Sequence, residues 1–316
     1  MARLDIGEAL GAGFKVIASR PLDCLAWGVT YFLIAVLPTF GLMFWIMPEF
    51  LHDAVSAASA GAADQMMPQM FASQLKFQAL QPLIWIGSLV GRAVVYSAIF
   101  RAVLTPGDRG FFGMRLGGAE LWVGLVLLVQ MILMGLLAFA LIMLCMGFWV
   151  PTIMAARNGF AGWEIPVGIV AVIAAAAVFL WLFVRYSMAA PMSFAERQFR
   201  LFESWKLTRG HGWGLFGLYL VAALATWLVA AVIEGVIFGV AIAALVGSGQ
   251  MQGLFNTMGA AADPTAFMQT FMPYIMGFAA VASIFGGYFM AMLAGPWAKA
   301  YQQLAAHTDA SRAEVF

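Results

Sequence analysis

The stretch LWVGLVLLVQMILMGLLAFALIMLCMGFWV, residues 121–150, runs for thirty residues without a charged side chain. A helix needs about 20 predominantly apolar residues to cross the hydrocarbon core of a bilayer. The whole chain has the same character: 64% of its 316 residues are hydrophobic and 10% are charged, whereas a soluble domain carries about 25% charged residues. A water-soluble core cannot hide so much apolar surface, so the sequence predicts an integral membrane protein.

Five further apolar runs have the length of a membrane crossing. Lipid offers the backbone no hydrogen-bond partner, so each run must be a helix that satisfies its own N–H and C=O groups. The runs at 121–150 and 213–247 exceed one crossing and are expected to tilt or to protrude. We predict an all-α, polytopic bundle of six transmembrane helices that forms one integral membrane domain over 1–316. The predicted crossings are 24–47, 82–104, 121–150, 166–190, 213–247 and 273–297.

Lys and Arg predict the orientation of these helices, because cytoplasmic connections collect positive charge. With six crossings, thirteen of the sixteen basic residues fall on one side, Lys76 and Arg157 fall on the other, and Arg92 remains within the membrane. We therefore expect a multi-pass membrane protein with both termini in the cytoplasm. The thirteen are Arg3, Lys15, Arg20, Arg101, Arg109, Arg115, Arg185, Arg197, Arg200, Lys206, Arg209, Lys299 and Arg312.

The segment before the fifth crossing, FRLFESWKLTRGHGWGLFGLYL at 199–220, changes from charged to apolar halfway along. Helical spacing from Ser193 puts Phe194, Leu201, Phe202 and Trp205 on one face and Glu196, Arg197, Arg200, Glu203 and Ser204 on the other. This pattern predicts an amphipathic helix lying in the membrane interface, with Trp205 at the boundary. The basic residues expected to face cytoplasm or lipid phosphate are Arg197, Arg200, Lys206 and Arg209.

Two other segments also lead into a crossing, which indicates a threefold internal pattern. The N-terminal segment has an apolar stripe of Ile6, Leu10, Gly13, Phe14 and Ile17. A shorter, glycine-rich segment occupies 107–122, and the stretches at 63–75 and 262–273, expected to be outer loops, share Met, Gln, Ala and Phe. We predict three units, each an amphipathic lead-in followed by a helical hairpin, at 1–104, 105–190 and 191–316.

The sequences of two lead-in segments resemble a bacterial family of six-helix membrane proteins. These segments are ERQFRLFESWKLTRGHGWGLFGLYL at 196–220 and RAVLTPGDRGFFGMRLGGAELW at 101–122. That family is related to the membrane domain of glycerophosphoryl diester phosphodiesterases. The resemblance implies a six-helix fold and a location in the bacterial inner membrane. The phosphodiesterase barrel has no counterpart in these residues, so its activity is not carried over.

Charged residues within the crossings are the candidate site. A charge at the bilayer centre costs at least about 2.5–3.5 kcal/mol, so Arg92 in the second crossing needs a partner. Glu234 in the fifth crossing is the candidate, because the two helices run in opposite directions and the residues lie at similar depths. The glycine pairs of GSLVG (87–91) and GVIFG (235–239) adjoin them and favour close helix packing. The expected cluster is Arg92, Glu234, Gln130, Tyr96 and Ser88.

Two interpretations of this cluster remain open at this point. Arg92 and Glu234 are either a buried pair that fixes how two units dock, or the lining of a polar pathway for an ion or substrate. Arg101 and Arg185, nearer the helix ends, are expected to snorkel toward the interface.

The sequence predicts no catalytic residues, metal or cofactor. Cys24 and Cys145 lie far apart inside apolar runs, and the histidines His52, His211 and His307 lie in connections or the tail without a recognised motif. The net charge of +1 is too small to attract nucleic acid electrostatically. We expect a non-enzymatic, accessory membrane scaffold that binds anionic lipid, a protein partner or a second copy of itself. The alternative is a small transporter or channel using Arg92 and Glu234, and a membrane hydrolase ranks third.

Overall fold

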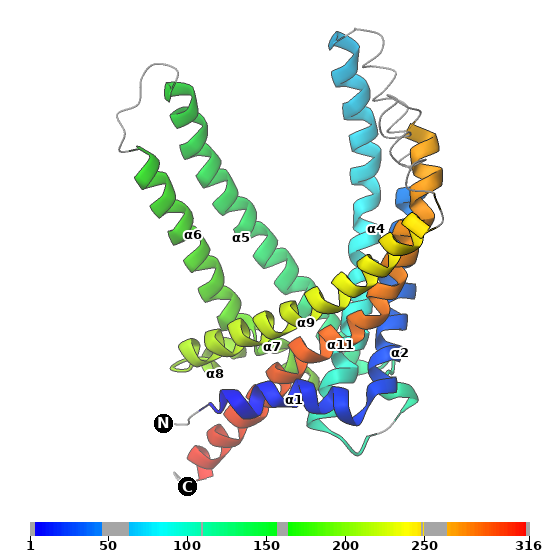
Figure 1. The fold of residues 1–316 in the computed structure, drawn as a ribbon. Coiled ribbons are helices and arrows are strands. Elements are labelled where there is room, and N and C mark those ends of the chain that lie inside the picture. The colour runs from blue at the N-terminus through cyan, green and yellow to red at the C-terminus, as the bar shows by residue number, and fades with distance from the viewer. Residues whose placement is uncertain are drawn as a thin grey trace.

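The computed structural model of the chain describes residues 4–45, 63–108, 110–156, 164–247, 249 and 264–313. Within these ranges every regular element is a helix (Figure 1). The predicted outer connections around residues 46–62, 157–163 and 250–263 lie outside the described residues. So do Arg3, Arg109 and Arg157 of the charge count, and His52.

The prediction of six apolar helices of membrane-spanning length is confirmed. Six helical stretches are long and apolar enough to cross a membrane, and each overlaps one predicted run. Their ends differ from the predicted ends by ten residues or fewer. The six stretches are Pro21–Trp45, Gln78–Leu104, Phe111–Gly147, Pro166–Glu196, Gly212–Ala244 and Tyr274–Ala306.

The long helices form three successive hairpins, preceded by α1 (Ile6–Ser19). In the first hairpin, α2 (Pro21–Tyr31), the π-helical turn η1 (Phe32–Val36) and a helix over 37–45 pair with α4 (Ala63–Leu104). The other hairpins are α5 (Gly118–Ala156) with α6 (Glu164–Tyr186), and α9 (Gly212–Gly247) with α11 (Pro264–Ala313). The connections at one end contain η2 (Phe111–Gly113), α7 (Ala189–Glu196) and α8 (Glu203–Leu207).

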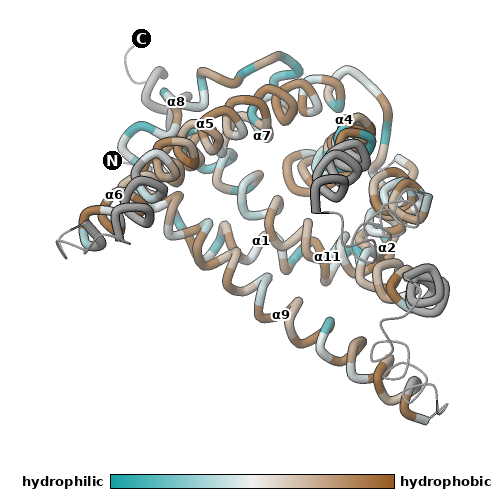
Figure 2. The backbone as a smooth tube through the Cα atoms, turned by 90° about the horizontal axis from the view of Figure 1, so that it is seen from above, coloured by the Kyte–Doolittle hydropathy of each residue, from teal (hydrophilic) through white to brown (hydrophobic). Residues whose placement is uncertain are grey.

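The two termini lie at the same end of the bundle, together with α1, α7 and α8 (Figure 1). The α5–α6 hairpin leans away from α2, α4 and α11 toward the opposite end (Figure 1). Hydrophobic residues predominate along the long helices (Figure 2), as expected for helices surrounded by lipid. Their outer halves are accordingly exposed in the protein alone, for example Val236 at 63%.

The packed core lies toward the end that carries the termini. It contains Trp27, Ile99, Val123 and Leu201, all of which are fully buried. The indole N–H of Trp27 donates to the carbonyl oxygen of Phe112 at 2.8 Å, which satisfies the one polar atom of this buried ring. Helix α11 is the central element, because it contacts α1, α2, α4 and α9.

Glycine pairs allow α11 to approach two helices from the other end of the sequence. A Cβ atom on Gly287 would lie 1.9 Å from the carbonyl oxygen of Cys24, and one on Gly28 would lie 2.1 Å from the carbonyl oxygen of Ile284. Farther along α11, a Cβ on Gly295 would lie 2.8 Å from the Cα of Gly13. Helices α1 and α2 therefore contact α11 backbone to backbone, as small residues permit in membranes.

The two glycine motifs noted in the sequence have different surroundings. A Cβ on Gly87 would lie 2.9 Å from the carbonyl oxygen of Ile34, and one on Gly91 would lie 3.0 Å from the Tyr31 ring, so GSLVG packs against the first crossing. No described atom lies within 4 Å of a Cβ placed on Gly235 or Gly239. Within the described residues, the glycines of GVIFG therefore make no close backbone contact, although Phe238 meets the ring of Phe278 on α11 with centroids 6.3 Å apart.

The lead-in before α9 is not one continuous helix, contrary to the pattern expected from Ser193. Helix α7 ends at Glu196 because Arg197 adopts a left-handed conformation, with φ 52° and ψ 41°. The Ser193 hydroxyl then accepts a hydrogen bond from the backbone N–H of Arg200 at 2.9 Å. This local side-chain to backbone bond competes with helix continuation, and the chain becomes helical again only at Glu203.

Two stretches predicted as outer loops are helical. Helix α4 already begins at Ala63, and α11 begins at Pro264. Their Met, Gln and Ala residues are good helix formers, so the helices continue past the apolar segment that identifies the crossing.

Candidate functional site

Four of the five residues expected to cluster within the membrane line one cavity. The cavity has a volume of about 570 Å³, and its walls come from α4, α5, α6, α7, α9 and α11. Its polar lining comprises Ser88, Arg92 and Tyr96 of α4, Gln130 of α5, and Ser187 in the turn after α6. The rest of the lining is apolar or aromatic, including Trp85, Phe179, Phe183 and Trp297.

The Arg92 side chain is exposed in this cavity. Among the residues that the structure describes, it forms neither an ion pair nor a hydrogen bond. The Ser88 hydroxyl lies 3.3 Å from the hydroxyl of Tyr31, and the Tyr96 ring packs against Phe100 with centroids 6.2 Å apart. The cavity thus combines one cation, a few neutral polar groups and apolar walls.

Glu234 does not belong to this cluster, and the ion pair expected with Arg92 is absent from the described part of the chain. Helix α9 reaches the cavity at Tyr219. Glu234 follows fifteen residues later, which corresponds to about 22 Å along a helix. A similar position within each apolar run does not give a similar depth here, because α9 follows an oblique path (Figure 1).

Within the described residues, a buried ion pair is instead formed by Arg101 and Glu120. Both side chains are nearly inaccessible, at 7% and 6% exposed. Arg101 donates to Glu120 and to the carbonyl oxygen of Gly113, and its Nε lies 3.6 Å from Asp108. The guanidinium also lies over the ring of Phe194, 5.4 Å from its centroid. This set of contacts joins the end of α4 to the start of α5.

The prediction that Arg101 snorkels to the interface is therefore wrong. The sequence signal was available: Glu120 is an acidic residue in the first turn of α5, where the helix dipole favours a carboxylate. This signal does not by itself predict a buried pair, because Arg101 and Glu120 lie at the edges of apolar runs, where side chains are usually solvated.

Arg185 is held by aromatic rings. Its guanidinium lies 5.6 Å from the centroid of Trp181 and 5.5 Å from that of Trp205. The two indole rings meet edge to face at 5.0 Å, and the Ser204 hydroxyl donates to the Arg185 carbonyl at 2.7 Å. Trp205 thus packs on α6 and holds α8 against the bundle, and desolvated cation–π contacts of this kind contribute about 2 kcal/mol.

The other residues expected to meet lipid phosphate fall into two groups. Arg200 is neutralised by Glu196 at 2.8 Å and by Glu203 at 3.0 Å. The hydrogen bond from Arg200 lowers the pKa of Glu203 below its ordinary value. Arg197, Lys206 and Arg209 are exposed and make no ion pair within the described ranges.

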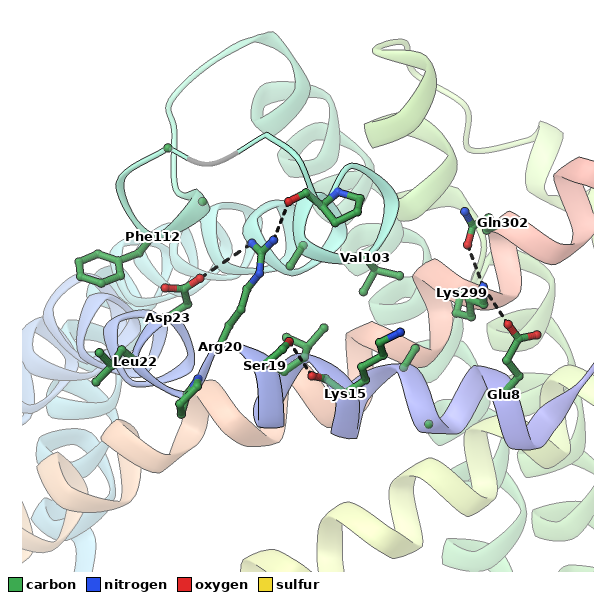
Figure 3. A pocket seen from close by; sticks show the side chains of 18 residues that line it. Glu8, Lys15, Ser19, Arg20, Leu22, Asp23, Val103, Phe112, Lys299 and Gln302 are labelled. Carbon is green, nitrogen blue, oxygen red and sulfur yellow. Dashed lines mark hydrogen bonds and ion pairs between the residues drawn. The ribbon is translucent and has the colours of Figure 1, made fainter.

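A second cavity, of about 850 Å³, lies at the end that carries the termini, between α1, the start of α2, the connection after α4, and α11 (Figure 3). Arg20 donates to the Pro106 carbonyl at 2.8 Å and lies 3.9 Å from Asp23. Lys15 lies along α1 between these groups and a second charged cluster, and within the described residues it has no ion pair.

The second charged cluster links α1 to α11. Lys299 pairs with Glu8 at 3.0 Å, and the Gln303 amide donates to the same carboxylate at 2.8 Å. The hydrogen bond from Lys299 holds the pKa of Glu8 below its ordinary value. Sequence analysis missed this cavity because Lys299, on α11, is far in the chain from Lys15 and Arg20. The available signal was the recurrence of Glu8, Lys15 and Ser19 on one face of α1.

Among the described residues, no group of three or more His, Cys, Asp or Glu side chains is placed to hold a metal ion. No protein-family model, curated protein or solved structure matches this chain. The family resemblance therefore rests on the lead-in segments alone.

Proposed function

We propose that this chain is a multi-pass protein of the bacterial inner membrane that acts as an accessory, non-enzymatic scaffold and holds anionic lipid headgroups at its cytoplasmic end. The observation that carries this proposal is the cavity of about 850 Å³. Its Lys15 is exposed and makes no ion pair within the described residues, whereas Arg20 and Lys299 are paired with Asp23 and Glu8. Lys206 and Arg209 lie at the same end of the bundle, on and beside α8. Exposed cations of this kind attract anionic lipid by about 1 kcal/mol each.

Cytoplasmic termini are part of this proposal. The support is that both termini and the connections rich in Lys and Arg lie at one end (Figure 1), which is the cytoplasmic end by the rule for positive charge. Enzyme fusions that report periplasmic exposure should be active at residues 60, 158 and 258 and inactive at 110, 205 and 310. Periplasmic activity of the fusion at 110 or 205 would reverse the proposed orientation.

The proposal also keeps the three units 1–104, 105–190 and 191–316. Each contains one hairpin of long helices, and a connecting segment at the same end precedes each hairpin. In α1 the buried residues are Ala9, Gly13 and Val16. Ile6, Leu10 and Ile17 of the expected stripe also pack against the core, whereas Phe14 is exposed. We interpret α1 and α7–α8 as interfacial lead-ins whose apolar sides face the bundle and whose charged sides face the lipid headgroups.

Lipid selectivity tests the scaffold proposal. Native mass spectrometry should find more bound phosphatidylglycerol than phosphatidylcholine when the full chain is offered both. The triple change Lys15→Gln, Lys206→Gln, Arg209→Gln should lower this preference by at least about tenfold, since each cation near the surface contributes about 1 kcal/mol. The preference should also weaken in high salt, which screens exposed charges.

Arg200→Gln is the matched control for the triple change. It removes a cation from the same surface, but one that Glu196 and Glu203 already neutralise. It should change the lipid preference far less than any one of the three free cations does. An unchanged preference in the triple variant would reject the headgroup function.

A transporter or channel is the second candidate, and the cavity beside Arg92 is the observation in its favour. The absence of Glu234 from that cavity removes half of the site on which this alternative was based. Ion flux through proteoliposomes that Arg92→Gln abolishes would favour transport over the scaffold.

A further inference from the structure

We propose that the cavity around Arg92 is a binding site within the membrane for the anionic head of an amphiphile, with Arg92 as the residue that holds the oxyanion. This site is separate from the proposed headgroup surface at the cytoplasmic end and does not depend on it. The chemical class is an alkyl chain that ends in a phosphate or carboxylate.

The first argument is the charge of Arg92. The residue lies twelve positions before Leu104, the end of α4, which is about 18 Å along the helix. An arginine at this depth is costly, and the described residues supply no counter-charge. A guanidinium offers five N–H donors in a fixed fork that matches phosphate and carboxylate oxygens. An anionic ligand would therefore compensate the charge that the protein itself leaves unpaired.

The second argument is the composition of the cavity wall. Gln130 and Ser88 flank Arg92 with further hydrogen-bonding groups, while Phe179, Phe183 and Met134 provide apolar surface. A volume of about 570 Å³ is in the range of small-molecule sites. A polar point within an apolar cavity fits a ligand with one charged end and one hydrocarbon end.

The third argument is access from the bilayer. The wall residues Trp85 and Met131 are 54% and 40% exposed, so the cavity reaches the surface of the bundle that faces lipid. It lies where the α5–α6 hairpin leans away from α4 and α11 (Figure 1). An amphiphile already dissolved in the membrane can enter sideways without crossing water.

Photo-crosslinking of the full chain in nanodiscs tests this inference. Two pairs of probes carry a diazirine on the alkyl chain: a fatty acid with its fatty alcohol, and phosphatidylglycerol with diacylglycerol. In each pair the alkyl chains are the same and only one member carries an oxyanion. Peptide mapping should place the crosslinks of an anionic probe on the cavity walls of α5 and α6. Labelling by the acid alone identifies a single-chain ligand, and labelling by phosphatidylglycerol identifies a membrane phospholipid.

Three variants assign the effect to Arg92. Arg92→Gln should reduce anionic labelling about tenfold, equivalent to about 1.4 kcal/mol, and Arg92→Lys should restore part of it. Glu234→Gln changes a charge in a crossing outside the cavity and should have no effect. The triple variant of Lys15, Lys206 and Arg209 should also label normally, which separates this site from the headgroup surface.

Two results would overturn the inference. One is equal labelling of the cavity by the charged and neutral members of both probe pairs. The other is unchanged anionic labelling in Arg92→Gln, provided that its thermal unfolding matches the unmodified protein and so shows a folded bundle.

Discussion

Glu120→Ala should destabilise the bundle by about 3 kcal/mol or more, because it leaves the buried Arg101 guanidinium without its counter-charge. Arg101 is 7% exposed, and its second carboxylate, Asp108, lies 3.6 Å away on an exposed turn. The loss can be measured by unfolding the purified protein in mixed micelles with increasing SDS, followed by tryptophan fluorescence.

Two comparisons make this result specific to the buried pair. Arg200→Ala breaks ion pairs of the same chemistry on the surface and should shift the unfolding midpoint much less. The double change Arg101→Met, Glu120→Leu should recover much of the loss, because apolar residues of similar volume often replace a buried pair without penalty. A single variant as stable as the unmodified protein would show that the pair does not hold α4 to α5.

Gly287→Ala is expected to be equally severe. Its Cβ would lie 1.9 Å from the carbonyl oxygen of Cys24 and 2.6 Å from the backbone N of Gly28. Both contacts are with backbone, so no side chain can rotate away and α2 must separate from α11. Overpacking of this kind costs about 3 kcal/mol, and it should appear as a lower thermal midpoint.

Gly286→Ala is the matched control in the adjacent position. No described atom lies within 4 Å of a Cβ there, so the change should be neutral or stabilise the helix by up to about 1 kcal/mol. Equal effects of the two substitutions would mean that Gly287 is not required for the close approach of α2 and α11.

The crossings could be predicted from the sequence because they depend on length and hydrophobicity alone. The contacts between helices could not be predicted. The apolar runs are hydrophobic on every face, so their sequences do not specify which helix packs against which face. Thus the close-packing glycines of α11 were missed, whereas Gly235 and Gly239 of GVIFG were expected to pack and have no described atom within 4 Å of a Cβ placed on them. The break at Arg197 was missed because helical spacing continues through it.

The part of the candidate site that lies on one helix could be predicted from the sequence, and the contact between two helices could not. Ser88, Arg92 and Tyr96 follow one another at helical spacing on α4, so their common face could be read from the sequence. Gln130 was the sole uncharged polar candidate in the neighbouring crossing and also lines the cavity. Glu234 was chosen by charge and apparent depth, but the tilt of α9 is set by packing, which the sequence of α9 alone does not specify.

The contact between α2 and α11 also sets an order of events during synthesis. Gly28 and Gly287 are 259 positions apart, and a ribosome that adds about 5–20 residues per second needs about 10–50 s to make the intervening chain. Throughout that interval α2 is in the bilayer without the helix that fits its glycine face, and α4, α5, α6 and α9 enter before α11 arrives. Closure of the bundle is therefore a late event in biogenesis, and a chain interrupted before α11 exposes the α2 surface to lipid, to insertion factors and to membrane proteases.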